Sequence, residues 1–178
     1  MSASVPARRV LVSVWAVLAV ALGASLAVAR AADGPLDDPD PAHQRPGILD
    51  GFGLPQPAGP ITPGIPGNGR RTVVFFERAA GVRALCDALA DSELAGAAVL
   101  AVVVSGPAGA GADCGPVTVV DDPRGRRAAA YGLRRPVDGG TPVGYAVVDR
   151  DGQVRYRTLD PSVADELDEV GTIVDATS

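Results

Sequence analysis

The two cysteines, Cys86 and Cys114, are the side chains of this chain best suited to chemistry. A cysteine thiolate is a nucleophile, and two cysteines that meet in an oxidising compartment form a disulfide or exchange one with a partner. Closing the loop of about 29 residues between them would stabilise the fold by about 3–4 kcal/mol on the chain-entropy model. Their residue types leave three roles open: a structural disulfide, two free thiols, and a redox pair that cycles between both states.

Cys86 lies on the apolar face of a predicted helix. Val82, Leu85, Cys86 and Leu89 follow one another at the i, i+3, i+4 and i+7 spacing of one helix face. Directly before this helix, residues 72–76 form an apolar β-branched and aromatic run that predicts a buried strand. A thiol buried on such a face acts as a small apolar side chain. Its burial argues against a bridge, because the loop carrying the second cysteine would have to reach over the helix.

Further strands and helices are predicted in alternation downstream. Four more stretches are predicted to form strands, and these are residues 97–105, 117–120, 145–148 and 153–157. A turn over 149–152 joins the last two strands as a hairpin. Residues 124–131 are predicted to form a helix that ends at Gly132, and Asp160 and Pro161 to open a last helix. This order predicts an α/β fold with a mixed sheet flanked by helices.

The N-terminal segment predicts export of everything that follows it. Residues 10–29 contain no charged side chain and would span about 30 Å as a helix, enough to cross a membrane. Arg8 and Arg9 precede this run, so residues 1–9 are expected to stay in the cytoplasm. We expect an uncleaved, single-pass signal-anchor helix. The alternative is cleavage near Ala31, which would release a secreted protein.

Residues 30–70 have the composition of a linker. Nine prolines and eight glycines lie within 33–70, too many for a segment that buries a core of its own. Apolar exceptions such as Ile61 and Ile65 are expected to dock on the following domain, 71–178, as a strap. The single histidine, His43, has no second metal ligand nearby, and we expect it to be solvated.

The charge balance excludes some classes of partner. The chain carries a net charge of −5, and without the three arginines before residue 31 the remaining 13 arginines and 21 acidic residues give −8. An acidic exported portion argues against binding nucleic acid or anionic lipid. No phosphate-binding glycine loop, Ser/His/Asp set or zinc-ligand spacing occurs in the sequence, so we expect no cofactor and no metal.

Three passages together resemble one family. They are V-V-F-F from Val73, V-V-D-D-P-R-G-R-R-A-A-A-Y-G-L over 119–133, and T-P-V-G-Y-A-V-V-D-R-D-G-Q-V-R-Y over 141–156. Their order is similar to the redoxin branch of the thioredoxin superfamily, which includes membrane-tethered thioredoxin-like proteins and peroxiredoxins. The resemblance covers 71–178 and implies a thioredoxin-like fold. It also implies a peptide-binding groove at Ala80, Gly81, Val82 and Arg83 together with Thr141 and Pro142, where Pro142 resembles the cis-proline of the fold.

The chain departs from this family at the residues that would carry the chemistry. Active thioredoxin-like proteins have Cys-x-x-Cys at the start of the first helix, where the helix dipole lowers the thiol pKa. Ala80 and Arg83 occupy those positions here and cannot supply a thiolate. A peroxiredoxin needs Thr or Ser three residues before its reactive cysteine, and Arg83 stands there before Cys86. Some atypical peroxiredoxins nevertheless pair a first-helix cysteine with a later one.

Cys114 is similar in sequence to part of a redox site, and Asp121 and Asp122 to part of a cation site, but their positions in the chain do not fit these sites. Cys114-Gly115-Pro116 is similar to the start of a Cys-Gly-Pro-Cys redox site, but it precedes a strand, and Val117 stands where the second cysteine would be. Asp121 and Asp122 lie at the end of a predicted strand, where we favour turn formation over a cation site.

We therefore expect a membrane-anchored, extracytoplasmic thioredoxin-like domain that has lost its dithiol site. It would act as a binding or accessory module in thiol-redox processes of the envelope, with a protein or peptide as its partner. The alternative is an atypical two-cysteine thiol oxidoreductase or peroxidase that uses Cys86 and Cys114. A third hypothesis is a purely structural role in the envelope.

Overall fold

The computed structural model describes Trp15 and residues 53–66, 69–106, 114–133, 136 and 140–177. Two compact units divide the chain, Met1–Gly34 and Pro35–Ser178. In the first unit, Trp15 lies in a helix and is 66% exposed. The predicted membrane-spanning helix over 10–29, Ala31 and His43 lie outside the described residues, so the anchor and its flanking boundaries stay predictions. Within the described part of the chain, no helix is long and apolar enough to cross a membrane.

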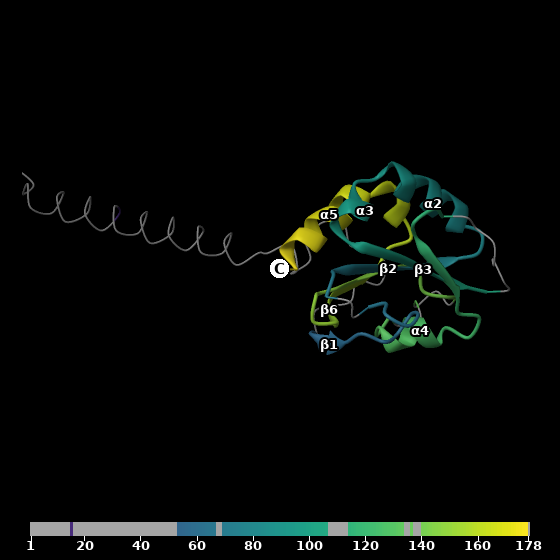
Figure 1. Ribbon diagram of the computed structural model, residues 1–178, viewed down its shortest axis with the longest axis horizontal. Coiled ribbons are helices and arrows are strands. Elements are labelled where there is room, and N and C mark those ends of the chain that lie inside the picture. Colours follow the sequence, from purple (N-terminus) through teal and green to yellow (C-terminus); the bar gives the residue numbers. More distant parts are fainter. Residues whose placement is uncertain are drawn as a thin grey trace, which may run out of the picture. The chain divides into compact units, whose positions relative to one another are not determined.

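A six-stranded mixed sheet forms the centre of the second unit (Figure 1). In chain order its strands are β1 (Gln56–Pro57), β2 (Thr72–Arg78), β3 (Val99–Ser105), β4 (Thr118–Asp121), β5 (Gly144–Val148) and β6 (Gln153–Leu159). Across the sheet the order is β1-β6-β5-β2-β3-β4. β2, β3 and β4 are parallel, whereas β5 runs antiparallel to β2, and β6 pairs antiparallel with β5 and β1. The sheet and its helices are consistent with a thioredoxin-like α/β fold.

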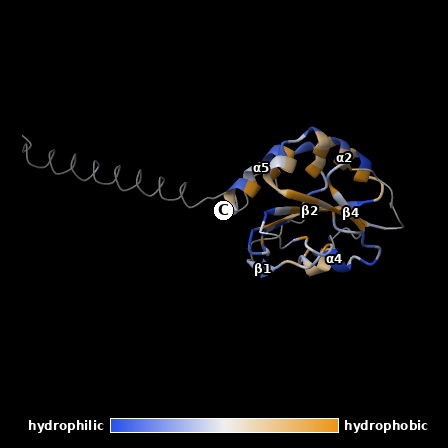
Figure 2. Ribbon diagram, in the orientation of Figure 1, coloured by the Kyte–Doolittle hydropathy of each residue, from blue (hydrophilic) through white to orange (hydrophobic). Residues whose placement is uncertain are grey.

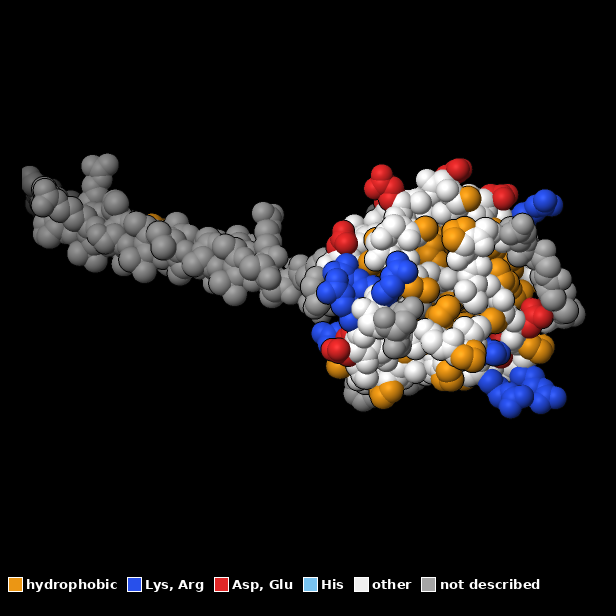
Figure 3. Space-filling view, in the orientation of Figure 1, with side chains coloured by type: hydrophobic (Ala, Val, Ile, Leu, Met, Phe, Trp, Pro, Cys, Tyr) orange, Lys and Arg blue, Asp and Glu red, His pale blue; other side chains and the backbone are white. Residues whose placement is uncertain are grey.

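Helices cover both faces of this sheet. They are α2 (Val82–Asp91), α3 (Leu94–Ala97), α4 (Arg126–Ala130) and α5 (Leu167–Ala176), with a 3-10 helix over Val163–Asp165. α2, α3 and α5 lie over one face, and α4 lies over the other with β1 beside it (Figure 1). The central strands are hydrophobic, while the helices carry both hydrophilic and hydrophobic residues (Figure 2). Charged side chains lie mostly around the rim of the face shown in Figure 3.

β2 confirms the prediction of a buried central strand. Its side chains alternate between the two faces, as a pleated strand requires. Val73 and Phe75 enter the core cluster under α2 and α5, and Val74 and Phe76 enter the cluster on the α4 side. Because helices or loops cover both faces, the strand is apolar at consecutive positions rather than at alternate ones.

The apolar face predicted for α2 is confirmed, since Val82, Leu85, Cys86 and Leu89 are its buried residues.

The turn interpretation of Asp122 is also supported by its contacts. Its carboxylate accepts hydrogen bonds from the main-chain N–H groups of three residues at the start of α4, at 2.7–3.2 Å. These N–H groups have no partner within the helix, so Asp122 caps α4.

The last helix begins later than predicted. α5 starts at Leu167, after the 3-10 helix. Asp160 does not cap it, because its Oδ1 accepts a hydrogen bond from the N–H of Ser162 at 2.9 Å and closes a local turn. The Asp-Pro-Ser sequence is equally suited to such a turn, and nothing in the sequence distinguishes the two outcomes.

The expected strap is present in residues 53–66. β1 adds to the free edge of β6, and Ile61 is only 3% exposed in the core cluster on the α4 side. Tyr131 donates a hydrogen bond from its hydroxyl to the carbonyl of Gly59 at 2.7 Å. The guanidinium of Arg157 donates one to the Gln56 side-chain oxygen at 2.8 Å. The strap therefore completes this face of the core.

Replacing Ile61 by Ala tests this packing. We expect the free energy of unfolding to fall by about 2–5 kcal/mol, because the change leaves a cavity among buried side chains. Chemical denaturation of the full chain measures this, with Pro63→Ala as the control at an exposed position of the same strap. If Ile61→Ala lowered the free energy of unfolding no more than Pro63→Ala does, the strap would not pack on the sheet in solution.

Candidate functional site

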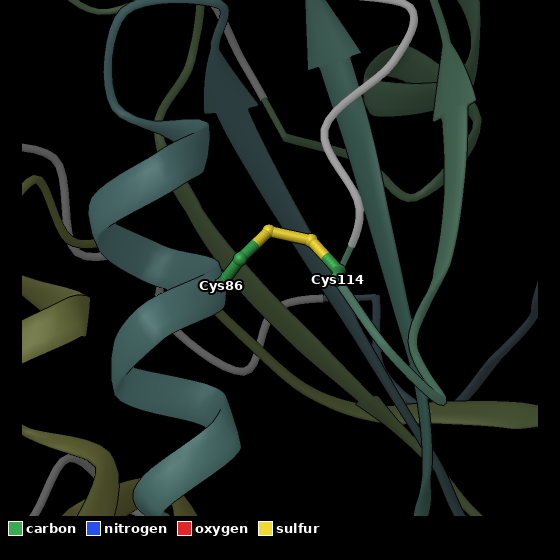
Figure 4. The surroundings of a disulfide bond; sticks show 2 residues. All are labelled: Cys86 and Cys114. Carbon is green, nitrogen blue, oxygen red and sulfur yellow. A yellow bond between two sulfur atoms is a disulfide. The ribbon is translucent and has the colours of Figure 1, made fainter.

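Cys86 and Cys114 are joined by a disulfide (Figure 4). Their Cα atoms are 5.0 Å apart, inside the usual range of about 4.4–6.8 Å for bridged cysteines. The two residues are 6% and 8% exposed, and both belong to the core cluster under α2 and α5. The bridge uses both cysteines of the chain, so two of the three roles remain: a structural disulfide and a cycling pair.

Different elements bring the two sulfur atoms together. Cys86 lies in the second turn of α2, and Cys114 lies on the connection between β3 and β4, just before β4. Because β3 and β4 are parallel, this connection must return from the carboxyl end of one strand to the amino end of the next. A turn closed by a hydrogen bond from the N–H of Val117 to the Cys114 carbonyl, at 3.2 Å, then leads into β4.

The expectation that burial of Cys86 would disfavour the bridge is therefore wrong. The crossover connection brings Cys114 into the same apolar cluster that contains the buried face of α2. Cys114 and Cys86 therefore meet on the buried side of α2. The bridge thus fastens the crossover connection to α2.

The start of α2 carries no sulfur. Ala80 and Arg83 are exposed, Val82 is 2% exposed, and Gly81 is the N-cap residue without a side-chain hydrogen bond to the helix. Cys86 lies one helical turn further along, on the buried face. The structure consequently brings the cysteines to each other but not to the position at which a thioredoxin-like dithiol would lie.

The segment that carries Thr141 and Pro142 lies at the same end of the sheet as the start of α2. Phe76 of β2 pairs with Gly144 of β5, so the segment before β5 lies beside the carboxyl end of β2. There, Nη2 of Arg78 donates a hydrogen bond to the Thr141 carbonyl at 3.2 Å. We call Arg78, Thr141 and the adjoining Pro142 the Arg78–Thr141 surface. A groove between this surface and Ala80, Gly81, Val82 and Arg83 stays a prediction.

Pro142 does not have the cis peptide bond that its resemblance to the family's cis-proline suggested. Among the described residues, the cis bonds precede Pro55 and Pro66, both in the strap. The Thr141–Pro142 bond is described and is not one of them.

Glu77 is a residue of this site that the sequence analysis missed. It lies on the same face of β2 as Val73 and Phe75, by strand alternation, and is 9% exposed. Its Oε1 accepts a hydrogen bond from the N–H of Arg78 at 2.7 Å. A Cβ atom at Gly81 would lie 2.7 Å from the Glu77 carboxyl, so glycine makes room for that group.

Burial raises the pKa of Glu77 above its ordinary value, and the N–H group and positive charge of Arg78 oppose part of that rise. The sequence pattern of this strand already indicates that Glu77 is buried. A glutamate that continues the apolar alternation of a buried strand faces the core, where a charge is costly.

Elsewhere, a small pocket of about 150 Å³ lies at the amino ends of β3 and β4, with Val99, Leu100, Pro116 and Val117 among its walls. It is at the opposite end of the parallel strands from the Arg78–Thr141 surface. Within the described residues, no three His, Cys, Asp or Glu side chains are grouped so that they could hold a metal ion.

No family model and no curated protein matches the chain. Among solved structures, one described as a thiol:disulfide interchange protein, DsbE, from Chlorobium tepidum is similar with a TM-score of 0.43 and 17% identity. That match covers 62% of this chain and 82% of the other. An uncharacterized conserved protein from Geobacillus kaustophilus has a TM-score of 0.34 and 19% identity over 53% of this chain and 57% of its own. Because both TM-scores are below 0.5, neither likeness says what this chain does.

Replacing Glu77 by Gln tests the buried carboxyl. A folded-state pKa above the unfolded one gives stability that is present below the unfolded pKa and is lost as the pH rises through the folded value. As the pH rises above 4.5, the ordinary value, we therefore expect the wild type to lose stability that Glu77→Gln keeps. Thermal unfolding between about pH 4 and 8 measures this. The difference in stability between Glu77→Gln and the wild type should grow with pH and then become constant.

Glu93→Gln, at an exposed position, controls for the loss of one formal charge. Unfolding curves in which Glu77→Gln and the wild type change in parallel with pH would show that Glu77 ionises as easily in the folded as in the unfolded chain.

Proposed function

We propose that this chain is a membrane-anchored, extracytoplasmic thioredoxin-like module that binds a protein or peptide partner in thiol-redox processes of the envelope. One observation carries the proposal. Both cysteines are buried in a bridge to each other, while the start of α2 presents Ala80 and Arg83. The chain in this form keeps the scaffold of a redox protein without a dithiol at its usual place.

The chemistry of the bridge supports a structural role. Disulfide exchange requires a thiolate to reach one of the two sulfur atoms, and reactive cysteines are accordingly at least partly exposed. Cys86 and Cys114 are 6% and 8% exposed and lie among apolar side chains. Closing a loop of this length with a disulfide raises the free energy of unfolding by about 3–4 kcal/mol, which is a large share of the stability of a domain of this size.

The bridge also supports the proposed location. Disulfides persist in oxidising compartments outside the cytoplasm and are rare inside it. An uncharged run over 10–29 behind two arginines would place the domain in such a compartment and keep it at the membrane. The anchor is inferred from the sequence, and the bridge is an independent reason for export.

A second candidate is a two-cysteine thiol oxidoreductase or peroxidase that cycles Cys86 and Cys114. The observation that favours it is the pairing itself, since the bridge joins a first-helix cysteine to a later segment as in some atypical peroxiredoxins. For this activity the crossover connection would have to leave the core so that a thiol becomes accessible. The same sulfur atoms would then form and break the bridge in every turnover.

Thiol reactivity and turnover of the full chain separate the two candidates. We expect no thiol to react with an alkylating reagent in the native chain, and two to react after unfolding with reductant. Turnover of hydrogen peroxide, or of oxidised glutathione, should equal that of the Cys86→Ala/Cys114→Ala variant. Mass spectrometry of the alkylated chain and a coupled assay measure these quantities.

The double variant is also the control for folding, and we expect it to remain folded with a free energy of unfolding lower by about 3–4 kcal/mol. Turnover by the wild type that disappears in this variant would make Cys86 and Cys114 the active pair. The binding-module proposal would then be wrong.

A further inference from the structure

We propose that the outer edge of β4 pairs with β4 of a second copy of this chain, in an antiparallel contact with a two-fold axis at Val119. Asp121 of each copy would then meet Arg70 of the other. The inference goes beyond the proposed function and does not depend on it, because the contact involves neither thiol chemistry nor the Arg78–Thr141 surface.

β4 is the edge of the sheet that suits a further strand. It ends the sheet on one side, and no second strand of the described residues pairs with it. Its four residues are all partly exposed. β1, at the other end of the sheet, has two residues, and Pro57 has no N–H group to donate to a further strand. An unpaired edge is a template for another strand, and pairing through β4 alone would stop at two copies.

The register of β4 on β3 decides which main-chain groups face outward. Neighbouring residues of a strand direct their N–H and C=O groups to opposite sides. Asp122 donates its N–H to the Val104 carbonyl at 2.7 Å, so alternate residues counted back from Asp122 face β3. The groups of Val119, Asp121 and, by the same alternation, Val117 therefore point away from β3.

Two of these outward groups already have partners within the chain. Val117 donates its N–H to the Cys114 carbonyl at 3.2 Å. The Asp121 carbonyl accepts a hydrogen bond from Nη1 of Arg127 at 2.9 Å. The groups that are left for another strand are the N–H and C=O of Val119, the N–H of Asp121 and the C=O of Val117.

A two-fold axis at Val119 pairs the groups that are left. The two copies of Val119 lie opposite each other, and each donates its N–H to the carbonyl of the other. Asp121 then lies opposite Val117 of the second copy and donates its N–H to that carbonyl. The two groups that this pairing does not need are the ones that already have partners. Because the axis repeats every bond, the edge is complementary to itself.

The side chains on this edge are complementary in charge. Opposite residues of an antiparallel pair project from the same face of the sheet, so Asp121 of one copy would lie beside Val117 of the other. Val117 is a wall of the pocket of about 150 Å³, and the exposed Arg70 is another. The Asp121 carboxylate has no ion pair or side-chain hydrogen bond within the described part of the chain. It would therefore meet a guanidinium in the second copy.

The net charge of −8 beyond residue 30 repels two copies at long range. At physiological ionic strength, however, charges act over only about 8 Å, so the local pair decides whether the two edges meet. Because the strand is short, the contact is small and the association should be weak in solution.

Sedimentation equilibrium of the full chain tests the proposal, at about 150 mM salt in density-matched detergent micelles that accommodate the predicted anchor. We expect a monomer–dimer equilibrium with a Kd on the order of 10 µM and no larger species. Asp121→Arg and Arg70→Asp should each raise the Kd about tenfold, because each places like charges opposite each other. The double variant Asp121→Arg/Arg70→Asp should return the Kd to within about threefold of the wild type. Asp151→Arg, at an exposed aspartate in the turn between β5 and β6, is the control and should leave the Kd unchanged.

Val119→Pro tests the main-chain pairing. Proline lacks the outward N–H, and the ladder to β3 does not use that group. We expect the Kd of this variant to be at least about tenfold higher than that of Val119→Ala, which also shortens the side chain but keeps the N–H. Thermal unfolding verifies that each variant is folded, and the charge variants serve the comparison if Val119→Pro is not.

A chain that stays monomeric at about 200 µM would overturn the proposal. A dimer that is unchanged by Asp121→Arg and by Val119→Pro would place the contact elsewhere and overturn it as well. If the double variant stayed as weak as the single ones, Asp121 and Arg70 would not meet. Binding of a capped peptide of residues 116–122 to a chain that remains monomeric would identify a foreign strand, rather than a second copy, as the occupant of this edge.

Discussion

The disulfide between Cys86 and Cys114 is the interaction on which the arrangement of this domain depends most. The parallel pairing of β3 and β4 requires a long connection across the sheet, and in many α/β proteins a helix packed on the sheet fills that role. Here the residues that lead into β4 are fastened to α2 by a covalent bond. The bond holds α2, the crossover and the edge strand β4 together, and it lies in the core that α2 and α5 share with the sheet.

This use of the cysteines separates stability from recognition. The sulfur atoms are inside the core, whereas Ala80 and Arg83 at the start of α2 are exposed. Arg78, at the end of β2, donates a hydrogen bond to Thr141 in the segment before β5. The buried carboxyl of Glu77 fills the space that Gly81 leaves open. A domain organised in this way keeps both cysteines in the core, as expected for the accessory module that we propose.

Much of the fold could be predicted because its signals are local. The apolar run of β2, the helical spacing around Cys86 and the turn that follows β5 depend on neighbouring residues alone. The pairing of the cysteines could not be predicted, because periodicity shows which face of a helix is buried but not which segment crosses it. The turn at Asp160 was missed, and the main-chain conformation at Pro142 was left open, for a related reason, since each residue suits two conformations and tertiary contacts choose between them. The burial of Glu77 could have been predicted, because strand alternation places its side chain on the core-facing side of β2.

The reduction potential of the Cys86–Cys114 bridge in the full chain distinguishes a structural disulfide from a cycling pair. Equilibration with dithiothreitol or glutathione buffers, followed by alkylation and mass spectrometry, gives this value. A bridge that stabilises the fold is itself stabilised by folding, so we expect a potential below about −300 mV, as for structural disulfides. A value between about −120 and −270 mV, the range of catalytic dithiols, would contradict it and identify the bridge as a redox-active pair.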